Sequence, residues 1–333
     1  MNKQAVSSKS VAKLAGVSQA TVSRVINHHP NVSPQMQERV LKAVKQLGYM
    51  PNAMAQGLIS NRSNLIAVVL KEMENPFFQN VLNRIEYHTA KIGKSVLFFN
   101  LSNGNSIDKI LESALHYRVE GIIITSGSIP EELVARSKQY NIPVVAFNCR
   151  FEEYNIFSVC SDNVTAGREM ARHLIALQYL PAIYIGCNEN VELRYRLSGF
   201  MEEMRRQDCT PETFSVPKNI YEVGYTETLK ALQRVPNCRA IAYSNDLLAF
   251  GGMDAIREKL RLSIPEDIAV IGFDDVTASV WKNYSLTTFQ QSVDDMVTHV
   301  MKYLLDRQNG LPREDEEHVV TLFPCKLIRR STT

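Results

Sequence analysis

Short hydroxyls, an amide and a guanidinium gather in one stretch near the start of the chain. The stretch contains Ser18, Gln19, Ala20, Thr21, Ser23 and Arg24. Hydroxyl groups suit the phosphate oxygens of nucleic acid, whereas glutamine and arginine suit the base edges of the major groove. The methyl group of Ala20 suits a thymine methyl or simply a close approach. The stretch therefore has the chemistry of a DNA-reading surface.

Three short helices are predicted around this stretch. Residues 10–15 form a short amphipathic pattern that stops at Gly16, and residues 19–26 place apolar side chains on one face after Ser18, a good N-cap. A third helix is predicted over 34–47, with a proline in its first position. Helix, tight glycine turn and helix is the helix-turn-helix pattern, whose second helix enters the major groove. A generic three-helix bundle with a polar face is the alternative.

Charge separates this head from the rest of the chain. Residues 1–62 carry eight Lys or Arg and one acid, so their net charge is +7. The whole chain carries only +2, because the remaining residues contain 29 bases and 34 acids. A small basic head on a mildly acidic body indicates a polyanion-binding module. A flexible basic tail is the alternative, and the regular helical pattern argues against it.

Composition excludes several classes of protein. The chain has 333 residues, of which 45% are hydrophobic, so it can bury a substantial core. No apolar run reaches the roughly 20 residues of a membrane span, and residues 1–20 lack the apolar core of a secretory signal. The six cysteines are scattered without a C-x-x-C pair, which argues against a disulfide framework or a zinc site. We therefore expect a cytoplasmic protein without a membrane partner or bound metal.

The body alternates between strand-like and helix-like patterns. Strands are predicted at 65–70, 95–99, 121–125, 143–147, 182–186, 239–243 and 268–271. Helices are predicted between them at 77–92, 106–118, 131–140, 163–178, 194–207, 223–234 and 246–260. Repeated β-α units predict doubly wound parallel sheets, and this number of strands exceeds one core. We therefore expect two α/β lobes.

Polar and aromatic residues follow several of these strands. They include Phe77, Phe78, Asn148, Asn245 and Asp274, and Arg196 opens a helix after another strand. Ligands of parallel sheets bind beyond the carboxyl ends of the strands, and this mixture suits a polyhydroxylated ring. Glu189 and Glu192 lie just before Arg196, where a phosphate or carboxylate ligand would need basic residues. These two acids therefore favour an uncharged or hydroxyl-rich ligand. The alternative for each residue taken alone is lobe closure or helix capping.

Two ungapped segments carry a specific resemblance. Residues 11–27 (VAKLAGVSQATVSRVIN) and 47–55 (LGYMPNAMA) closely resemble the head of the lactose/galactose repressor (LacI/GalR) family. The resemblance continues through 75–78 (NPFF), 196–200 (RLSGF), 244–246 (SND), 271–275 (IGFDD) and 327–332 (LIRRST), so it covers essentially the whole chain. It implies a helix-turn-helix head on a periplasmic-binding-protein-like body of two lobes.

The resemblance also implies domain boundaries. Residues 1–50 would be the DNA-binding domain and 51–62 a hinge helix. The N-terminal lobe would comprise 63–161 and 291–318, and the C-terminal lobe 162–290 and 319–333. These crossings between lobes rest on the resemblance, since periodicity alone does not predict them.

The resemblance assigns roles to individual residues. Gln19, Ala20 and Arg24 would read bases, and Ser18, Thr21, Ser23 and Asn27 would grip phosphates. In the hinge, Asn52, Ala55 and Leu58 would contact DNA, with Leu58 wedging between base steps in the minor groove. Effector contacts would come from Phe77, Phe78, Asn148, Arg196, Asn245, Asp274 and Gln291. Gln290 is an equally plausible neighbour of Gln291.

These features predict a regulator and no enzyme. The chain lacks a phosphate-binding loop, a dinucleotide fingerprint, a zinc-protease motif and a nucleophile elbow, so we expect no catalytic residue and no cofactor. A transport receptor shares the body fold, but it has no use for the basic head. We expect a repressor that binds pseudo-palindromic double-stranded DNA as a homodimer. A small sugar-like effector between the lobes would control its operator affinity.

Overall fold

The chain folds into two compact units, Met1–Ser63 and Asn64–Thr333. The computed structural model describes residues 6–26, 29–50, 63–70, 74–101, 107–125, 131–151, 156–188, 190–310 and 320–333. Each unit has its own hydrophobic core. The predicted hinge, 51–62, lies outside the described residues.

The first unit contains the three predicted helices. They are α1 (Ser8–Ala15), α2 (Gln19–Ile26) and α3 (Pro34–Leu47). Valines from each helix meet in the core, with Val11, Val22 and Val40 fully buried. Two of the three helices are only eight residues long, too short to be stable alone in water. Packing around this small core therefore stabilises them.

A glycine turn joins α1 to α2. Gly16 has a φ of 62°, a left-handed conformation that glycine adopts without a steric penalty. The Arg39 guanidinium of α3 donates to Ala15 O at 2.6 Å and to Gly16 O at 3.3 Å. A cation at these carbonyls also offsets the negative end of the α1 dipole. The tight turn and the Arg39 bonds thus fix the start of α2.

The first sheet of the body is parallel, with strand order β11-β5-β4-β3-β1-β2. Its strands are β1 (Leu65–Leu70), β2 (Ser95–Asn100), β3 (Ile122–Ile124), β4 (Val144–Phe147), β5 (Phe157–Ser161) and β11 (Val320–Phe323). One face packs against α5 (Pro76–Lys91) and α12 (Val293–Gln308). The other face packs against α6 (Ile107–His116) and α7 (Glu131–Gln139). Buried side chains alternate between the two faces of β1, as expected for a strand covered on both sides.

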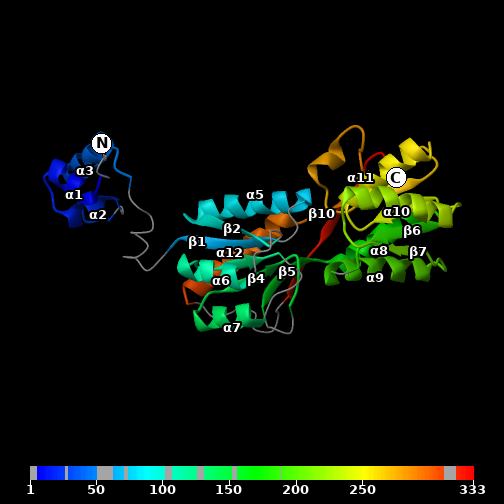
Figure 1. Cartoon of the computed structure of the whole chain (residues 1–333), viewed down its shortest axis with the longest axis horizontal. Helices are drawn as coiled ribbons and strands as arrows, with labels where there is room; N and C mark the ends of the chain where they lie inside the picture. Colours follow the sequence, from blue (N-terminus) through cyan, green and yellow to red (C-terminus); the bar gives the residue numbers. More distant parts are fainter. Residues whose placement is uncertain are drawn as a thin grey trace. The chain divides into compact units, whose positions relative to one another are not determined.

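The second sheet is also parallel, with order β7-β6-β8-β9. Its strands are β6 (Ala182–Gly186), β7 (Glu212–Ser215), β8 (Ala240–Tyr243) and β9 (Ala269–Ile271). The helices α8 (Asn163–Ala176) and α9 (Val191–Arg206) pack on one face, and α10 (Tyr221–Arg234) and α11 (Asp246–Asp254) on the other. A π-helical turn, Ala255–Lys259, extends α11, and a 3-10 turn spans Thr277–Val280. The predicted fold of two doubly wound lobes is confirmed (Figure 1).

One predicted crossing between the lobes is wrong in part. The segment 319–333 is predicted in the second lobe, but its first strand, β11, pairs with β5 along the edge of the first sheet, whereas Cys325 and Leu327 pack against the core of the second lobe. Pro324 then separates β11 from β12 (Cys325–Ile328), which pairs antiparallel with β10 (Thr288–Gln291). A proline cannot donate a backbone hydrogen bond, so the run divides into two strands with different partners. The other predicted domain boundaries stay predictions.

Glycine allows α8 and α9 to cross closely. A Cβ atom on Gly167 would lie 2.0 Å from Arg196 O, and one on Gly199 would lie 2.0 Å from Val164 O. The two backbones therefore touch where any larger residue would separate them. This contact sets the first turn of α8 beside Arg196.

Candidate DNA-reading helix and effector site

The predicted DNA-reading residues lie on the outer face of α2. Val22 and Val25 of the same helix are buried in the head core, which fixes the opposite face outward. Exposed or half-exposed side chains on that face are Ser18, Gln19, Ala20, Thr21, Ser23 and Arg24. Six neighbouring side chains, including an amide and a guanidinium, are thus presented on a short helix of the basic head.

Three hydrogen bonds order the start of this surface. Ser18 Oγ accepts from the Thr21 amide at 3.1 Å and lies 2.9 Å from Thr21 Oγ1. Gln19 Nε2 donates to Ser8 Oγ of α1 at 2.8 Å. The bond to Ser8 engages one amide hydrogen of Gln19. The predicted contacts Asn27, Asn52, Ala55 and Leu58 lie outside the described residues.

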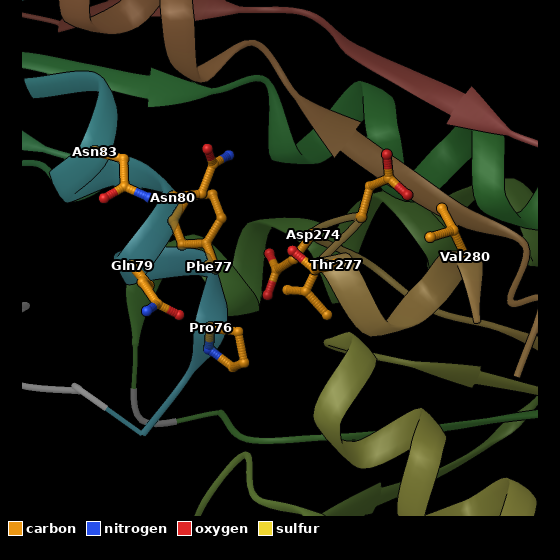
Figure 2. Close-up of a pocket in the computed structure, with 10 residues that line it drawn as sticks. Pro76, Phe77, Gln79, Asn80, Asn83, Asp274, Thr277 and Val280 are labelled. Carbon is orange, nitrogen blue, oxygen red and sulfur yellow. The ribbon is translucent and has the colours of Figure 1, made fainter. Parts of the chain in front are cut away.

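In the body, a cavity of about 270 Å³ brings together two predicted effector residues, Phe77 and Asp274. Its wall consists of Pro76, Phe77, Gln79, Asn80 and Asn83 from α5, together with Asp274, Asp275, Val276, Thr277 and Val280. Asp274 directs its carboxylate toward the first turn of α5 (Figure 2). Amides and carboxylates line much of this α5 cavity, so it suits a ligand that donates hydrogen bonds.

Two side-chain amides hold the carboxylate of Asp274. Gln291 Nε2 donates to Asp274 Oδ1 at 2.7 Å, and Asn75 Nδ2 donates to Asp274 Oδ2 at 3.2 Å. The Asp274 backbone has a φ of 115°, a region that residues with a side chain rarely adopt. Such strain costs about 1–3 kcal/mol and persists where the surroundings determine the conformation, often at functional sites.

A second carboxylate, Asp246, lies beneath Asp274 and is fully buried. It accepts from Thr288 Oγ1 at 2.6 Å, from Ser279 Oγ at 2.7 Å and from the Val276 amide at 3.0 Å. Burial, and then the charge of Asp274, raise the pKa of Asp246 to about 7, against the effect of these hydrogen bonds. Near neutral pH, therefore, this carboxyl group is partly protonated.

Arg196 lies buried at the start of the α8–α9 crossing. Its Nε and Nη2 donate to Asn163 Oδ1 at 3.1 and 2.7 Å, and its Nη1 donates to Ser244 O. The guanidinium also lies over the Phe273 ring, 3.2 Å from the ring centroid. These contacts with an amide, a carbonyl and an aromatic face fix the guanidinium plane.

An ion pair joins the lobes beside Arg196. Arg150, three residues after β4, donates through Nε to Glu192 Oε1 at 2.7 Å and through Nη2 to Glu192 Oε2 at 3.1 Å. Asn163 Nδ2 donates to the same Oε2 at 2.8 Å. Burial lowers the pKa of Arg150, but its bonds to Glu192 and the charge of Glu192 outweigh burial and raise the pKa above its ordinary value. We call the group formed by Arg150, Asn163, Glu192 and Arg196 the Arg196 network.

Hydrogen bonds connect the Arg196 network to the α5 cavity. Asn163 Nδ2 donates to Ser161 O at 3.2 Å, and Ser161 Oγ donates to Gln291 Oε1 at 2.7 Å. Gln291 then bonds Asp274, and Asn75 bonds Asp274 while capping α5 through the Phe77 amide at 3.0 Å. An uninterrupted path therefore runs from Arg196 to the first turn of α5.

The other predicted effector residues lie outside the α5 cavity and have different contacts. Phe78 is buried beside Phe77, with their ring centroids 5.3 Å apart. Asn245 caps α11 by accepting from the Leu248 amide at 3.0 Å, and its Nδ2 donates to Asn219 O at 3.3 Å. Asn148 has a φ of 56°, and its buried Oδ1 has no hydrogen-bond partner among the described residues. The wall of the α5 cavity does not include the remaining predicted effector residues, Phe78, Asn148, Arg196, Asn245 and Gln291.

Gln290 and Gln291 differ in how much of each side chain is exposed. Gln291 is 5% exposed and bonds Ser161 and Asp274. Gln290 is exposed and donates to Asp275 Oδ2 at 2.8 Å, beside the Asp275–Arg330 ion pair. Gln291 is therefore the one that faces the buried path.

Sequence reasoning missed Asn75, Arg150, Ser161 and Asn163 as site residues. Asn75 precedes a proline at a helix start, which is a recognisable N-cap signal, and Asn163 directly follows Asp162, the N-cap of α8. Arg150 and Ser161 carry no comparable signal, because their partners come from the other lobe or from a distant segment.

The described residues do not offer a metal site or a membrane span. Within them, no group of three or more His, Cys, Asp or Glu side chains could hold a metal ion. Their helices are also too short or too polar to cross a membrane.

Comparison with known proteins identifies both units. Residues 9–52 match the model of bacterial regulatory proteins of the lacI family. Residues 63–331 match the model that describes periplasmic binding proteins and the sugar-binding domain of the LacI family.

Full-length relatives share this arrangement. The ribose operon repressor of Halalkalibacterium halodurans is 30% identical over 98% of this chain and 96% of its own length. The transcriptional repressor PurR of Haemophilus influenzae is 30% identical over 97% of each chain. The Lac repressor dimer, solved with operator and the anti-inducer ONPF, superposes with a TM-score of 0.86 at 26% identity over 99% of each chain.

These matches decide between the two functional classes left open by the sequence. A transport receptor would resemble the body alone, whereas the regulatory match covers the basic head and the curated relatives are repressors. The chain therefore belongs to the LacI family of bacterial transcription regulators.

Proposed function

We propose that this chain is a cytoplasmic repressor without enzymatic activity, which binds a pseudo-palindromic operator as a homodimer. The observation that carries the proposal is the outward face of α2, where Gln19 and Arg24 stand beside small hydroxyl residues on a head of net charge +7. One such helix reads one half-site, so a two-fold operator requires two chains. In the dimer, α5 and α11 are the proposed contact helices.

The body would bind the small molecule that controls operator affinity. A small sugar-like effector bound among Asp274, Arg196 and the polar groups that follow the strands would bias the two lobes toward one arrangement. Curated relatives include ribose and sucrose operon repressors, and a regulator from Alkaliphilus metalliredigens was solved with D-xylulofuranose at 26% identity. These names favour sugars as the first class to test. Coupling between effector and operator is typically about 1–3 kcal/mol.

The hydrogen-bonded path from Arg196 to Asn75 gives this coupling a physical route. It consists of buried and half-buried side chains from both lobes, so a ligand that replaces one bond changes how the lobes meet. Two alternative lobe arrangements with different affinities for the ligand would suffice for a population shift.

Footprinting of the full-length protein on fragments of its own genome tests the proposal. We expect protection of an inverted repeat, with an affinity that falls steeply as salt rises because phosphate contacts release counterions. A thermal-shift panel of sugars, sugar phosphates, nucleosides and purines then identifies candidate effectors. Absence of any protected inverted repeat at low salt, with and without those compounds, would refute the repressor assignment.

A further inference from the structure

Glu192 occupies an unusual position for an acid in a ligand site. Its carboxylate is 3% exposed and accepts three hydrogen bonds, two from Arg150 and one from Asn163. A buried carboxylate needs such compensation, because leaving its charge unpaired costs several kcal/mol. Glu192 therefore depends on a cation that the other lobe supplies.

The pairing also determines what Arg150 can do. Both its Nε and its Nη2 are committed to Glu192, and its guanidinium lies over the Tyr195 ring at 4.4 Å. A bidentate arginine is the usual protein group for binding a carboxylate or phosphate. Here an internal carboxylate already occupies it, so an anionic ligand would have to displace Glu192.

The Arg196 network contains two guanidiniums, Arg150 and Arg196, and one carboxylate, Glu192. Asn163 bridges them, since its Nδ2 donates to Glu192 while its Oδ1 accepts from Arg196. Glu192 thus cancels one cation and orients, through Asn163, the other.

We propose that Glu192 sets the charge class of the effector, so that the site accepts neutral hydroxyl-rich molecules and rejects phosphorylated or carboxylated ones. This inference rests on the proposed effector site. Glu192 acts as a positioning and specificity-determining residue through Arg150 and Asn163.

Unpaired acceptors support a neutral ligand independently. Asn148 Oδ1 and Asn188 Oδ1 are buried and lack a partner among the described residues. Each residue closely follows the carboxyl end of a parallel strand, β4 or β6, where ligands of such sheets bind. Buried acceptors are normally satisfied, and sugar hydroxyls are donors that could satisfy them.

Glu192→Gln tests the proposal directly. Glutamine keeps an acceptor for Asn163 but leaves the charge of Arg150 uncancelled. We expect binding of ribose 5-phosphate, glucose 6-phosphate and inorganic phosphate to tighten about tenfold or more at constant ionic strength, as for a regained charged hydrogen bond. Glu203→Gln is the matched control, because Glu203 is a buried, ion-paired acid of the same helix whose partners are Arg172 and Arg206.

The opposite substitution supplies a second readout. Arg150→Gln leaves the Glu192 carboxylate uncompensated, so binding should shift toward the cationic sugar glucosamine relative to glucose. The Arg150→Gln variant therefore tests the proposed charge selectivity even if Glu192→Gln fails to fold. In Arg150→Gln/Glu192→Gln, which has neither charge, affinity for the phosphates should return to that of the wild type.

Several results would overturn the inference. They are unchanged phosphate binding in a folded Glu192→Gln protein, raised phosphate binding that persists in the double variant, or no shift toward glucosamine in Arg150→Gln. Wild-type protein that binds a sugar phosphate more tightly than the parent sugar would also overturn it. All readouts are titration calorimetry without DNA, so failure of the repressor assignment is seen separately, by footprinting.

Discussion

The two predicted binding surfaces of this chain are built in opposite ways. On α2, the side chains that would read DNA point outward, and the hydrogen bonds of Ser18, Gln19 and Thr21 are local ones at the start of the helix. In the Arg196 network, every side chain is largely buried and bonded to another member. The first surface is an exposed face supported by a separate core, whereas the second is part of a core.

This difference predicts how each surface responds to substitution. Exposed residues away from caps and buried networks usually change stability by less than about 0.5 kcal/mol. Members of a buried polar network cannot be removed without leaving a partner unsatisfied, at about 1–3 kcal/mol for each group. DNA specificity should therefore vary without loss of folding, while effector specificity and body stability are tied together.

The largest expected effect comes from the helix crossing that positions Arg196. Gly199→Ala would place a Cβ 2.0 Å from Val164 O, so α8 and α9 must separate. We expect a loss of about 3 kcal/mol or more in the free energy of unfolding, because the clash is with backbone. Urea denaturation of the body measures this loss, and effector binding should weaken with it.

Ser198→Ala is the matched control for this crossing. Ser198 is the exposed neighbour of Gly199, and its Oγ donates locally to Tyr195 O at 2.8 Å. Its substitution should leave stability and effector binding nearly unchanged. Equal stability of Gly199→Ala and wild type would show that the crossing tolerates a wider spacing, and would weaken the contrast between the two surfaces.

A smaller effect is expected from the buried carboxyl beneath Asp274. The folded-state pKa of Asp246, about 7, lies above its ordinary value of 3.8. Between these values the folded state holds a proton that the unfolded state has released, so the stability from this group falls as pH rises through the window and levels off above pH 7. In Asp246→Asn this slope disappears.

Denaturation at pH 5, 6, 7 and 8 checks this expectation. From pH 5 to pH 8, the wild type should lose about 2–3 kcal/mol more than Asp246→Asn, since the titration covers about two pH units and one pKa unit corresponds to about 1.4 kcal/mol. Parallel profiles for the two proteins would mean that Asp246 does not titrate in this range. Asparagine can still accept from Val276 and Ser279 through its oxygen, so we expect the variant to fold.

Sequence patterns predicted the helices with clear caps and apolar spacing and the strands with a continuous apolar run. The helices α2 and α3 begin and end where the caps and apolar spacing indicate, and strands such as β1 and β6 appear as continuous apolar runs. Three strands, β5, β7 and β10, were missed. β5 contains buried Ser158 and Ser161, and β7 is an edge strand with mostly exposed residues, so neither has the apolar run of a central strand.

The site was predicted less completely than the fold. Asp274, Arg196 and Gln291 were identified by resemblance, and the structure places all three on one hydrogen-bonded path. The ion pair of Arg150 and Glu192 could not be predicted, because its residues are 42 positions apart and belong to different lobes. Local patterns carry no information about which side chains meet when two separately formed lobes close on each other.

The smallest expected effect concerns Gln19 on the DNA-reading face of α2. Gln19→Ala removes an exposed amide that donates to Ser8 Oγ, so stability should change by no more than about 0.5 kcal/mol. Operator affinity should fall by about 1 kcal/mol at one base pair in each half-site, because one base-edge contact is lost. Gln46→Ala, which changes an exposed glutamine on α3, is the control and should leave both quantities unchanged.

Mobility shift against operators varied at single positions separates a base reader from a phosphate contact. Equal weakening on every sequence would make Gln19 a phosphate contact, and a loss of several kcal/mol in stability would remove the distinction between an exposed reading face and a buried site.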